Sequence, residues 1–465
     1  MTRFTLPRME ASATTMLVTA LLVSLFMLQA AAISAPVAPA TSAVPAHPFS
    51  GTQTIENHPL GYGRRLQATG RNGFAWSQWR AYIALRAWKK AITDDPKNVT
   101  RSWKGKYVCR YEGVFCQHPP GQKYSSIKVV AAIDLNGAHL KGTLVPELGL
   151  LREIAVFHLN SNRFCGGVPD SFRNMKLLYE LDLSNNQFSG RFPMVTLAIP
   201  KLVFLDLRFN KFYGRLPSEL FAKRTLKIIF VNNNKFEGTI PSNFGQSRVA
   251  AITLANNKFR GTIPRSISDM SNTLFEILAL GNKFEGRIPS DIGKLKNILL
   301  FDFSTNKIKG DLPESIRNLT DLEVFNMSNN LLGGTVTAEL CRLKNLATLD
   351  LSDNFFTKLE SACRALNRRV LDISGNCLLT RSYYNQKSEA TCASFYGWSP
   401  PPPLSSPPPP SPPPPPTPSP PPPPTPTPSP PPPPTPTPSP PPPPTLSPPP
   451  PPTPSTYTPP PPTSR

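Results

Sequence analysis

The chain has 465 residues, seven cysteines, 61 prolines and a formal net charge of +21. Its last 66 residues hold 43 of the prolines, and so proline-rich a stretch cannot build a hydrophobic core. These numbers exclude a single uniform globular domain and predict a folded, basic part joined to a proline-rich tail.

Residues 1–35 are predicted to be a secretory signal peptide. Arg3 and Arg8 precede an apolar run over residues 16–28, and small residues follow that suit signal peptidase. The run is short for a bilayer span, although a signal anchor stays open as an alternative. No other stretch predicts a membrane span, so we expect an extracellular protein. Residues 36–75, rich in Ala, Pro, Thr and Gly, are predicted to be a flexible leader.

Residues 76–130 are predicted to form an N-terminal cap. Apolar residues at helical spacing end at Asp94-Asp95-Pro96, which stops a helix. They are Trp79, Ala84, Leu85, Trp88, Ala91 and Ile92. In an exported chain, Cys109 and Cys116 favour a disulfide over a metal site.

Residues 131–380 repeat one phrase about every 24 residues. Its clearest copy runs from Leu178 to Gly190, and Ala138 replaces the asparagine in the first of about eleven copies. The recurring asparagines are Asn162, Asn186, Asn210, Asn234, Asn257, Asn282, Asn306, Asn330, Asn354 and Asn376. This period and pattern predict an α/β solenoid of plant-type leucine-rich repeats, with a short parallel sheet inside and helical or 3₁₀ turns outside. The asparagine amide is expected to bond backbone groups that the turn leaves unpaired.

Several stretches resemble one protein family. Residues 87–96, Trp103, residues 108–116 and the phrase at 160–167 resemble the N-terminal cap and second repeat of the leucine-rich repeat extensins, which are plant cell-wall proteins. The resemblance implies binding of rapid alkalinisation factor peptides, which are small, basic and cysteine-rich, and a role linking wall formation to growth sensing at the cell surface.

The remaining cysteines predict two more disulfides and one free thiol. Cys341 and Cys363 occupy the same place on adjacent repeats, within reach of a bridge, and Cys377 and Cys392 can close a C-terminal cap over residues 381–399. Cys165 is left over. It is predicted either to be a buried free thiol or to link two chains in a homodimer.

Residues 400–465 are predicted to be an extensin-like tail. Ser419, Ser429 and Ser439 are each followed by five prolines, which favours polyproline II. Serine followed by a proline run is typical of extensins, whose prolines are hydroxylated and glycosylated, so the resemblance implies attachment to the wall. Tyr457 is the tail's single tyrosine, a departure from the tyrosine-rich extensin pattern. A rigid spacer or a ligand for proline-binding domains is the alternative.

Two faces of the predicted solenoid carry candidate sites. The position after the asparagine is often basic, which predicts either a solvated row or a polyanion-binding row for pectin or another wall polysaccharide: Arg163, Lys211, Lys235, Lys258, Lys283 and Lys307. On the concave strand face, apolar residues expected to be exposed stand beside acidic ones, which predicts a peptide site. Its candidate residues are His158, Glu180, Asp182, Asp206, Arg208, Phe230, Thr253, Glu276, Leu278, Leu280 and Asp302.

Three sequons predict N-glycosylation at Asn98, Asn318 and Asn326. Asn326 is expected on the concave face, where a glycan would restrict the ligand to the earlier repeats. No catalytic constellation, phosphate loop or metal spacing is found, so we predict no enzyme and no cofactor, and export argues against a nucleic-acid partner. A structural wall protein that holds pectin and a polygalacturonase-inhibitor-like defence module stay open as alternatives, and a cell-surface receptor is a further candidate partner.

Overall fold

The computed structural model describes residues 76–119, 127–367, 369–378 and 385–397. The chain divides into two units, residues 1–400 and 401–465. The predicted signal peptide, leader and proline-rich tail lie outside the described residues, as does Tyr457. The following paragraphs concern the first unit.

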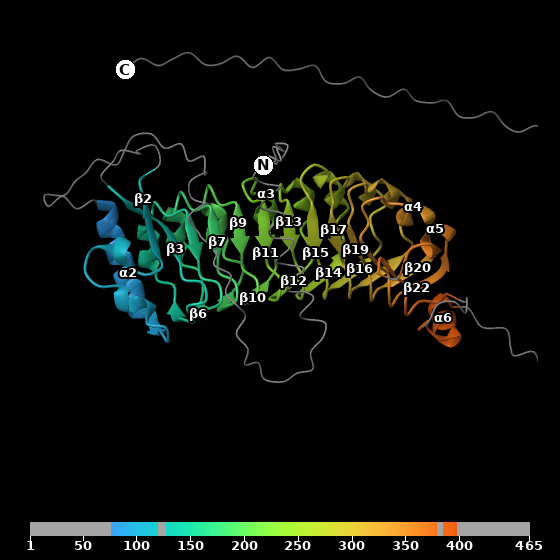
Figure 1. The fold of residues 1–465 in the computed structure, drawn as a ribbon, viewed down its shortest axis with the longest axis horizontal. Coiled ribbons are helices and arrows are strands. Elements are labelled where there is room, and N and C mark those ends of the chain that lie inside the picture. Colours follow the sequence, from blue (N-terminus) through green and yellow to red (C-terminus); the bar gives the residue numbers. More distant parts are fainter. Residues whose placement is uncertain (1–75, 120–126, 368, 379–384, 398–465) are drawn as a thin grey trace, which may run out of the picture. The chain divides into compact units, whose positions relative to one another are not determined.

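Each repeat crosses two parallel sheets before it turns back, and the repeats stack into the solenoid predicted from the sequence (Figure 1). The first sheet has twelve strands, of which only β2 runs antiparallel to its neighbour. Its strands are β2 (Val114–Gln117), β3 (Val129–Asp134), β5 (Val156–His158), β7 (Glu180–Asp182), β9 (Phe204–Asp206), β11 (Ile228–Phe230), β13 (Ala251–Thr253), β15 (Glu276–Leu278), β17 (Leu300–Asp302), β19 (Val324–Asn326), β21 (Thr348–Asp350) and β23 (Leu371–Asp372).

The second sheet, with eleven strands, was not predicted. Its strands are β1 (Ile92–Asp94), β4 (Lys141–Thr143), β6 (Arg163–Gly166), β8 (Gln187–Gly190), β10 (Lys211–Gly214), β12 (Lys235–Gly238), β14 (Lys258–Thr262), β16 (Lys283–Gly286), β18 (Lys307–Gly310), β20 (Leu331–Val336) and β22 (Phe355–Leu359). In a strand such as β12, Phe236 points into the core while Lys235 and Glu237 point outward.

Short helical turns complete the repeats, as expected. They are η3 (Pro146–Leu150), η4 (Asp170–Asn174), η5 (Met194–Ala198), α3 (Ser218–Ala222), η6 (Ser242–Gln246), η7 (Arg265–Met270), η8 (Ile292–Lys294), η9 (Glu314–Asn318), α4 (Ala338–Cys341) and α5 (Ser361–Arg364). Proline is the residue before six of these turns, where its fixed φ suits entry into a helical turn. The core lies between these turns and the two sheets, and stacked rings such as Phe188, Phe212 and Phe236 run along it.

The recurring asparagines, which we call the asparagine ladder, join each repeat to the one before it. Asn210 Oδ1 accepts the Phe188 N–H at 2.9 Å, and its Nδ2 donates to the Leu183 carbonyl at 2.8 Å. The same two bonds recur from Asn162, whose partners are Leu140 and Leu135, to Asn376, at the last turn. The ladder therefore satisfies buried backbone groups that the strands leave unpaired, as predicted.

Ala138 takes the ladder position in the first repeat for a physical reason. An asparagine there would have to bond the backbone of a preceding repeat, and what precedes it is the N-terminal cap. Ala138 is buried, so an amide without partners at this position would be costly.

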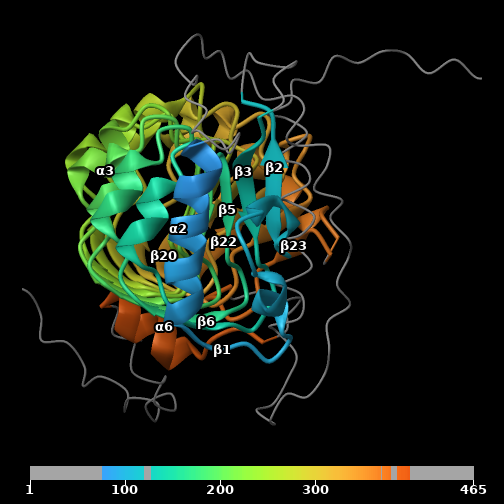
Figure 2. The same cartoon turned by 90° about the vertical axis from the view of Figure 1, so that its left-hand side faces the viewer.

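The N-terminal cap closes the first repeat with one long helix and two strands (Figure 2). Helix α2 (Trp76–Ala91) buries Ala84, Leu85 and Trp88, and the Trp88 ring lies 5.6 Å from that of Phe164. Trp79 was expected on the buried face but is 42% exposed, tilted against Tyr82. The cap also includes η1 (Val99–Ser102) and η2 (Val108–Arg110). Strands β1 and β2 pair antiparallel with β4 and β3, which covers the open edge of both sheets.

All three predicted disulfides are present. The Cα separations are 5.5 Å for Cys109–Cys116, 5.1 Å for Cys341–Cys363 and 5.8 Å for Cys377–Cys392. Cys165 is part-exposed and unpaired.

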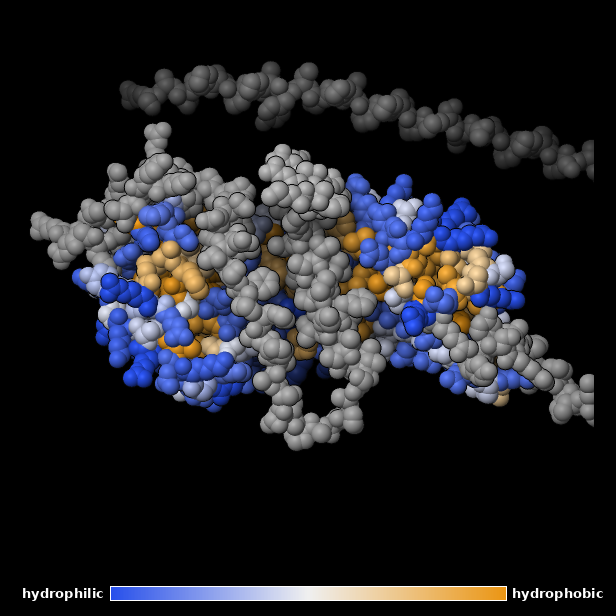
Figure 3. Space-filling view, viewed as in Figure 1, coloured by the Kyte–Doolittle hydropathy of each residue, from blue (hydrophilic) through white to orange (hydrophobic). Residues whose placement is uncertain are grey.

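The surface separates apolar from polar residues. In the view of Figure 3, hydrophobic residues lie along the middle of the visible described surface, and hydrophilic residues follow both long edges. Among the described residues, none of the helices combines the length and apolar character that a membrane crossing requires.

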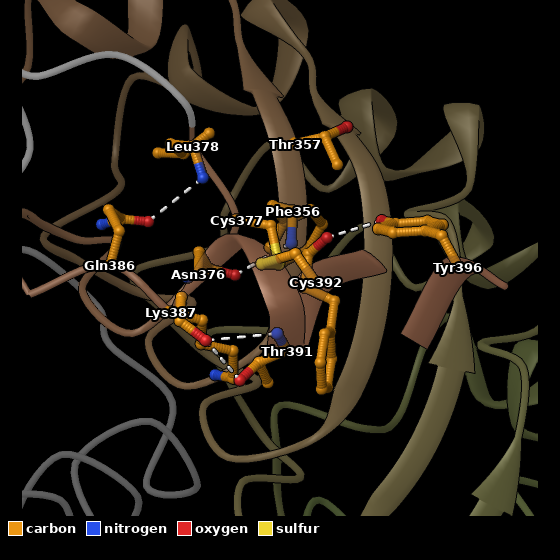
Figure 4. Close-up of a disulfide and its surroundings, with 12 residues drawn as sticks. Phe356, Thr357, Asn376, Cys377, Leu378, Gln386, Lys387, Thr391, Cys392 and Tyr396 are labelled. Carbon is orange, nitrogen blue, oxygen red and sulfur yellow. Dashed lines mark hydrogen bonds between the residues drawn. A yellow bond between two sulfur atoms is a disulfide. The ribbon is translucent and has the colours of Figure 1, made fainter. Parts of the chain in front are cut away.

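At the C-terminal end, helix α6 (Glu389–Tyr396) is tied to the second sheet (Figure 4). The Tyr396 hydroxyl donates to the Phe355 carbonyl at 2.6 Å and accepts the Gly334 N–H at 3.2 Å. The Phe395 and Phe355 rings stack with centroids 3.7 Å apart. A Cβ on Gly333 would lie 2.5 Å from the Tyr396 hydroxyl, so glycine is required for this close approach.

The asparagine ladder yields a stability prediction. Asn210→Ala leaves the Phe188 N–H without a partner in the core and removes the shorter of two side-chain hydrogen bonds to the Leu183 carbonyl, so the free energy of unfolding should fall by about 1–3 kcal/mol. Urea unfolding followed by circular dichroism measures this change. Asn174→Ala, at an exposed position, is the control and should shift stability by less than about 0.5 kcal/mol. Equal shifts would contradict the assigned role of the ladder.

Candidate functional site

The outer face of the first sheet, predicted to be concave, presents two regular columns of side chains. Strand register places Val156, Glu180, Phe204, Ile228, Ala251, Glu276, Leu300, Val324 and Thr348 in one column, which we call column A. Column B contains Asp134, His158, Asp182, Asp206, Phe230, Thr253, Leu278, Asp302, Asn326, Asp350 and Asp372. Arg208 and Leu280 follow column B by two residues. The face thus brings all eleven predicted peptide-site residues together.

Most column B carboxylates have a local structural role that the sequence analysis missed. Asp302 Oδ1 accepts the Ser304 N–H at 2.9 Å and the Ser304 hydroxyl at 2.7 Å. The same pair of bonds joins Asp182 to Ser184, Asp350 to Ser352 and Asp372 to Ser374. The aspartate–x–serine spacing therefore closes the turn after these four strands, and the second oxygen of each carboxylate makes no bond to the serine.

The apolar part of the face is larger than predicted, and it is buried. Phe230 and Leu278 were expected to be exposed, but they are 1% and 2% exposed. Phe204 of column A packs its ring edge-to-face on Phe230 at 5.8 Å, and the Arg208 guanidinium lies over the same ring at 5.1 Å. Ile228 and Ala251 join this cluster, which is separate from the main core. Column A was missed because its apolar members occupy positions that also hold Glu180 and Glu276.

Three carboxyl groups in the middle of the face have strongly raised pKa values. Burial, with repulsion from Asp182, raises the pKa of Asp206 to about 8 against the opposing effect of Arg208. Arg208 Nε lies 2.8 Å from Asp206 Oδ2, but the pair makes no aligned hydrogen bond. Burial and repulsion from Glu323 raise the pKa of Glu276 to about 7, and burial raises that of Asp302 to about 6. Glu276 Oε1 has no hydrogen-bond partner among the described residues.

His158 differs from these acids because it has an acidic partner. Its Nε2 lies 3.2 Å from Glu180 Oε2. Burial lowers the pKa of His158, but the hydrogen bond to Glu180 and the carboxylates of Asp182 and Asp134 outweigh burial and raise it. Within the described ranges, no group of three His, Cys, Asp or Glu side chains is arranged to hold a metal ion.

The predicted basic row lies on the outer face of the second sheet, and one of its members differs from the others in exposure and pairing. Lys211, Lys235, Lys258, Lys283 and Lys307 each begin a strand and are exposed. Arg163 is only half-buried and pairs with Asp94 of the N-terminal cap at 2.8 Å. Arg163 therefore binds the cap. Its partner is 69 positions away in the chain, so the repeat spacing alone could not predict this ion pair.

The row is also less uniform than its period suggests. Each lysine lies opposite the residue two positions beyond the previous lysine, so Lys235 faces Tyr213 and Lys258 faces Glu237. Lys283 faces Arg260, and Lys307 faces Glu285. The charge density therefore varies along the sheet, and two of the five lysines have a carboxylate as their cross-strand neighbour.

The predicted glycosylation sites differ in exposure. Asn98 and Asn318 are exposed. Asn326 is half-buried in column B, where its Oδ1 accepts the Ser328 N–H at 3.0 Å in the turn that aspartates close elsewhere. Glycosylation at all three stays a prediction.

Two family models match the chain. They are a leucine rich repeat N-terminal domain over residues 82–117 and a Leucine Rich Repeat over residues 177–195 and 225–247. Leucine-rich repeat extensin-like protein 2 of Arabidopsis thaliana is 56% identical over 227 residues, which cover 49% of this chain and 28% of the relative. The chain thus matches less than a third of that relative's length.

Solved structures agree on the fold. The Arabidopsis receptor kinase HAESA, in a complex with the peptide hormone IDA and the co-receptor SERK1, is 26% identical with a TM-score of 0.53, over 64% of this chain and 54% of that one. The ectodomain of the receptor kinase GASSHO1/SCHENGEN3 from Arabidopsis thaliana gives a TM-score of 0.58 at 24% identity, over 65% of this chain and 36% of that one. At that identity the second match bears on the fold alone. The solenoid, its disulfide-closed ends and the 56% identity over 227 residues make this chain similar to the leucine-rich repeat extensin-like proteins.

Proposed function

We propose that this chain is an extracellular cell-wall protein that binds a basic, cysteine-rich signalling peptide of the rapid alkalinisation factor type on the first-sheet face. The observation that carries the proposal is that apolar side chains lie beside acidic side chains, most of which have no basic partner. Phe230 and Leu278 stand beside Asp206, Glu276 and Asp302, and only Asp206 has a basic partner in the described residues.

A cationic peptide would supply the positive charge that these acids lack. A carboxyl group whose pKa is raised by burial gains from a cation placed beside it, because the pair restores the charged form. Apolar anchors and complementary charge together favour tight and fast binding. A peptide can contact Phe230 and Leu278 only if it uncovers them, since both are buried.

The comparison with the HAESA complex supports this use of the fold, since that protein is a plant leucine-rich repeat receptor bound to a peptide hormone. Its co-receptor makes a cell-surface receptor a second candidate partner here. Pectin, the other proposed partner, belongs to the second sheet and is treated below. The proposal includes a role in wall formation and cell growth.

Peptide binding is tested by calorimetry with a folded basic, cysteine-rich peptide. Glu276→Gln and Leu278→Asp should each weaken binding about tenfold or more, which corresponds to ~1.4 kcal/mol. Asp350→Asn is the control, because it keeps the oxygen that accepts from Ser352 and lies outside the apolar cluster. Its dissociation constant should change by less than about threefold. A larger loss in the control than in the other two would place the site elsewhere.

Attachment to the wall is tested separately. Residues 400–465 carry the serine–proline repeats, so the full chain should resist extraction from walls by salt. A chain ending at residue 399 should be released into the salt-soluble fraction. Equal release of both would remove the anchoring role of the tail.

A homodimer through Cys165 is the third element of the proposal. The thiol is unpaired and part-exposed on β6, so it is available to a second chain. On non-reducing gels, the secreted protein should run partly as a dimer, and Cys165→Ser should run as a monomer. A parent protein that is entirely monomeric would end this idea.

A further inference from the structure

We propose that Tyr213 and the four cations around it form a second binding site, which takes an extended uronic-acid polysaccharide on the outer face of the second sheet. The site does not rest on the peptide-binding proposal, because it lies on the other sheet. The site also differs from the predicted row of basic residues, because it includes one aromatic side chain and occupies one place along the sheet.

Tyr213 is an exposed ring on an otherwise polar surface. Its neighbours in β10 alternate, with Phe212 buried in the core and Lys211 on the same outer face as Tyr213. Tyr213 is 50% exposed. On the outer faces of the described second-sheet strands β4, β6, β8, β10, β12, β14, β16 and β18, it is the one aromatic residue.

Four basic residues lie near Tyr213 by strand register and sequence position. Lys211 lies two residues before Tyr213 on the same outer face, Arg215 lies two residues after it, just beyond the end of β10, and Lys235 is its partner on β12. Arg191 approaches from the preceding repeat, because its Cγ lies 3.7 Å from where a Cβ on Gly214 would stand. All four are exposed. The nearest acid by register is Glu237, two residues after Lys235, which leaves an excess of positive charge.

The four cations have no ion-pair partner among the described residues, a property they share with Lys258, Lys283 and Lys307, whereas several other basic groups are paired. Arg163 pairs with Asp94, Arg317 with Glu314, and Lys294 with Asp291. Unpaired charge concentrated on one face attracts a polyanion. The cations come from three successive repeats, so they span about 10 Å across strands that lie ~4.8 Å apart.

This arrangement favours an extended acidic polysaccharide over a single small anion or an acidic peptide. Cations distributed over several strands match a polymer that carries a carboxylate on each unit. An exposed aromatic ring offers a flat apolar surface to the C–H face of a sugar, which a peptide backbone does not present. The neighbouring Arg215 stem is held across Gly238, where a Cβ would lie 2.8 Å from its Cγ, so this guanidinium is partly positioned in advance.

The test is calorimetry on the full secreted chain with an oligogalacturonate as the probe. The triple variant Lys211→Gln/Arg215→Gln/Lys235→Gln should weaken binding by about tenfold or more. Its matched control, Lys258→Gln/Lys283→Gln/Lys307→Gln, removes the same charge from the same sheet and should weaken binding by less than about threefold. If the two triple variants lose the same amount of affinity for oligogalacturonate, the proposal is overturned, because the loss then depends on total charge and not on this site.

Tyr213→Ala separates sugar recognition from charge. The substitution keeps every cation and should weaken oligogalacturonate binding about fivefold, whereas Phe115→Ala, at another exposed aromatic residue, should leave it unchanged. Binding of the peptide should be the same in Tyr213→Ala as in the parent, which distinguishes failure here from failure of the proposed function. Three results would overturn the proposed site. Oligogalacturonate could bind Tyr213→Ala as tightly as it binds the parent, an acidic peptide could bind the parent as tightly as oligogalacturonate does, or the parent could fail to bind oligogalacturonate.

Discussion

The buried side-chain amide of the asparagine ladder is the interaction on which the rest of this structure depends. The strands of the first sheet are two to six residues long, and each repeat then turns away, so backbone N–H and C=O groups are left unpaired inside the solenoid. An asparagine amide presents an acceptor and two donors on a short stem, which suits it to bond groups of two adjacent repeats at once. Without it, every repeat would bury several unsatisfied polar groups, each of which costs free energy.

The ladder also determines where functional side chains can lie. Because it fixes one repeat against the next, residues at equal positions form columns on both sheets. On the first sheet the columns place Phe230 and Leu278 beside Asp206 and Glu276. On the second sheet they place Tyr213 beside Lys235. The two proposed sites therefore occupy separate surfaces of one scaffold, one suited to a cationic peptide and the other to an acidic polymer.

Much of the fold could be predicted, because it follows from a period. The asparagine spacing predicted the solenoid, and the positions of Cys341 and Cys363 on adjacent repeats predicted their disulfide. The second sheet could not be found in the same way, since strands such as β12 are four residues long and end with a glycine, which is typical of turns. The positions of the column B aspartates were predicted correctly. Their bonds to serine were not predicted, and these bonds would compete with a ligand for the carboxylates.

Exposure and pairing were the hardest features to predict. The sequence places Phe230 and Leu278 on the outer side of the strand, but it contains no information on what packs over them. Arg163 matches the lysine row in position, and its partner Asp94 comes from a cap whose placement depends on the whole fold. Tyr213 was overlooked because an isolated tyrosine at a strand end has no periodic signal, and its significance comes from cations on neighbouring strands.

Amide hydrogen exchange in the native protein tests the role of the asparagine ladder most directly. The N–H groups of Phe188, Phe212 and Phe236 donate to asparagine Oδ1 atoms of the following repeat. If the ladder holds the repeats together, these amides should exchange only through global unfolding, with the same free energy as the best-protected strand amides of the first sheet. Exchange at the rate of exposed loop amides, in a protein that remains folded, would contradict the account.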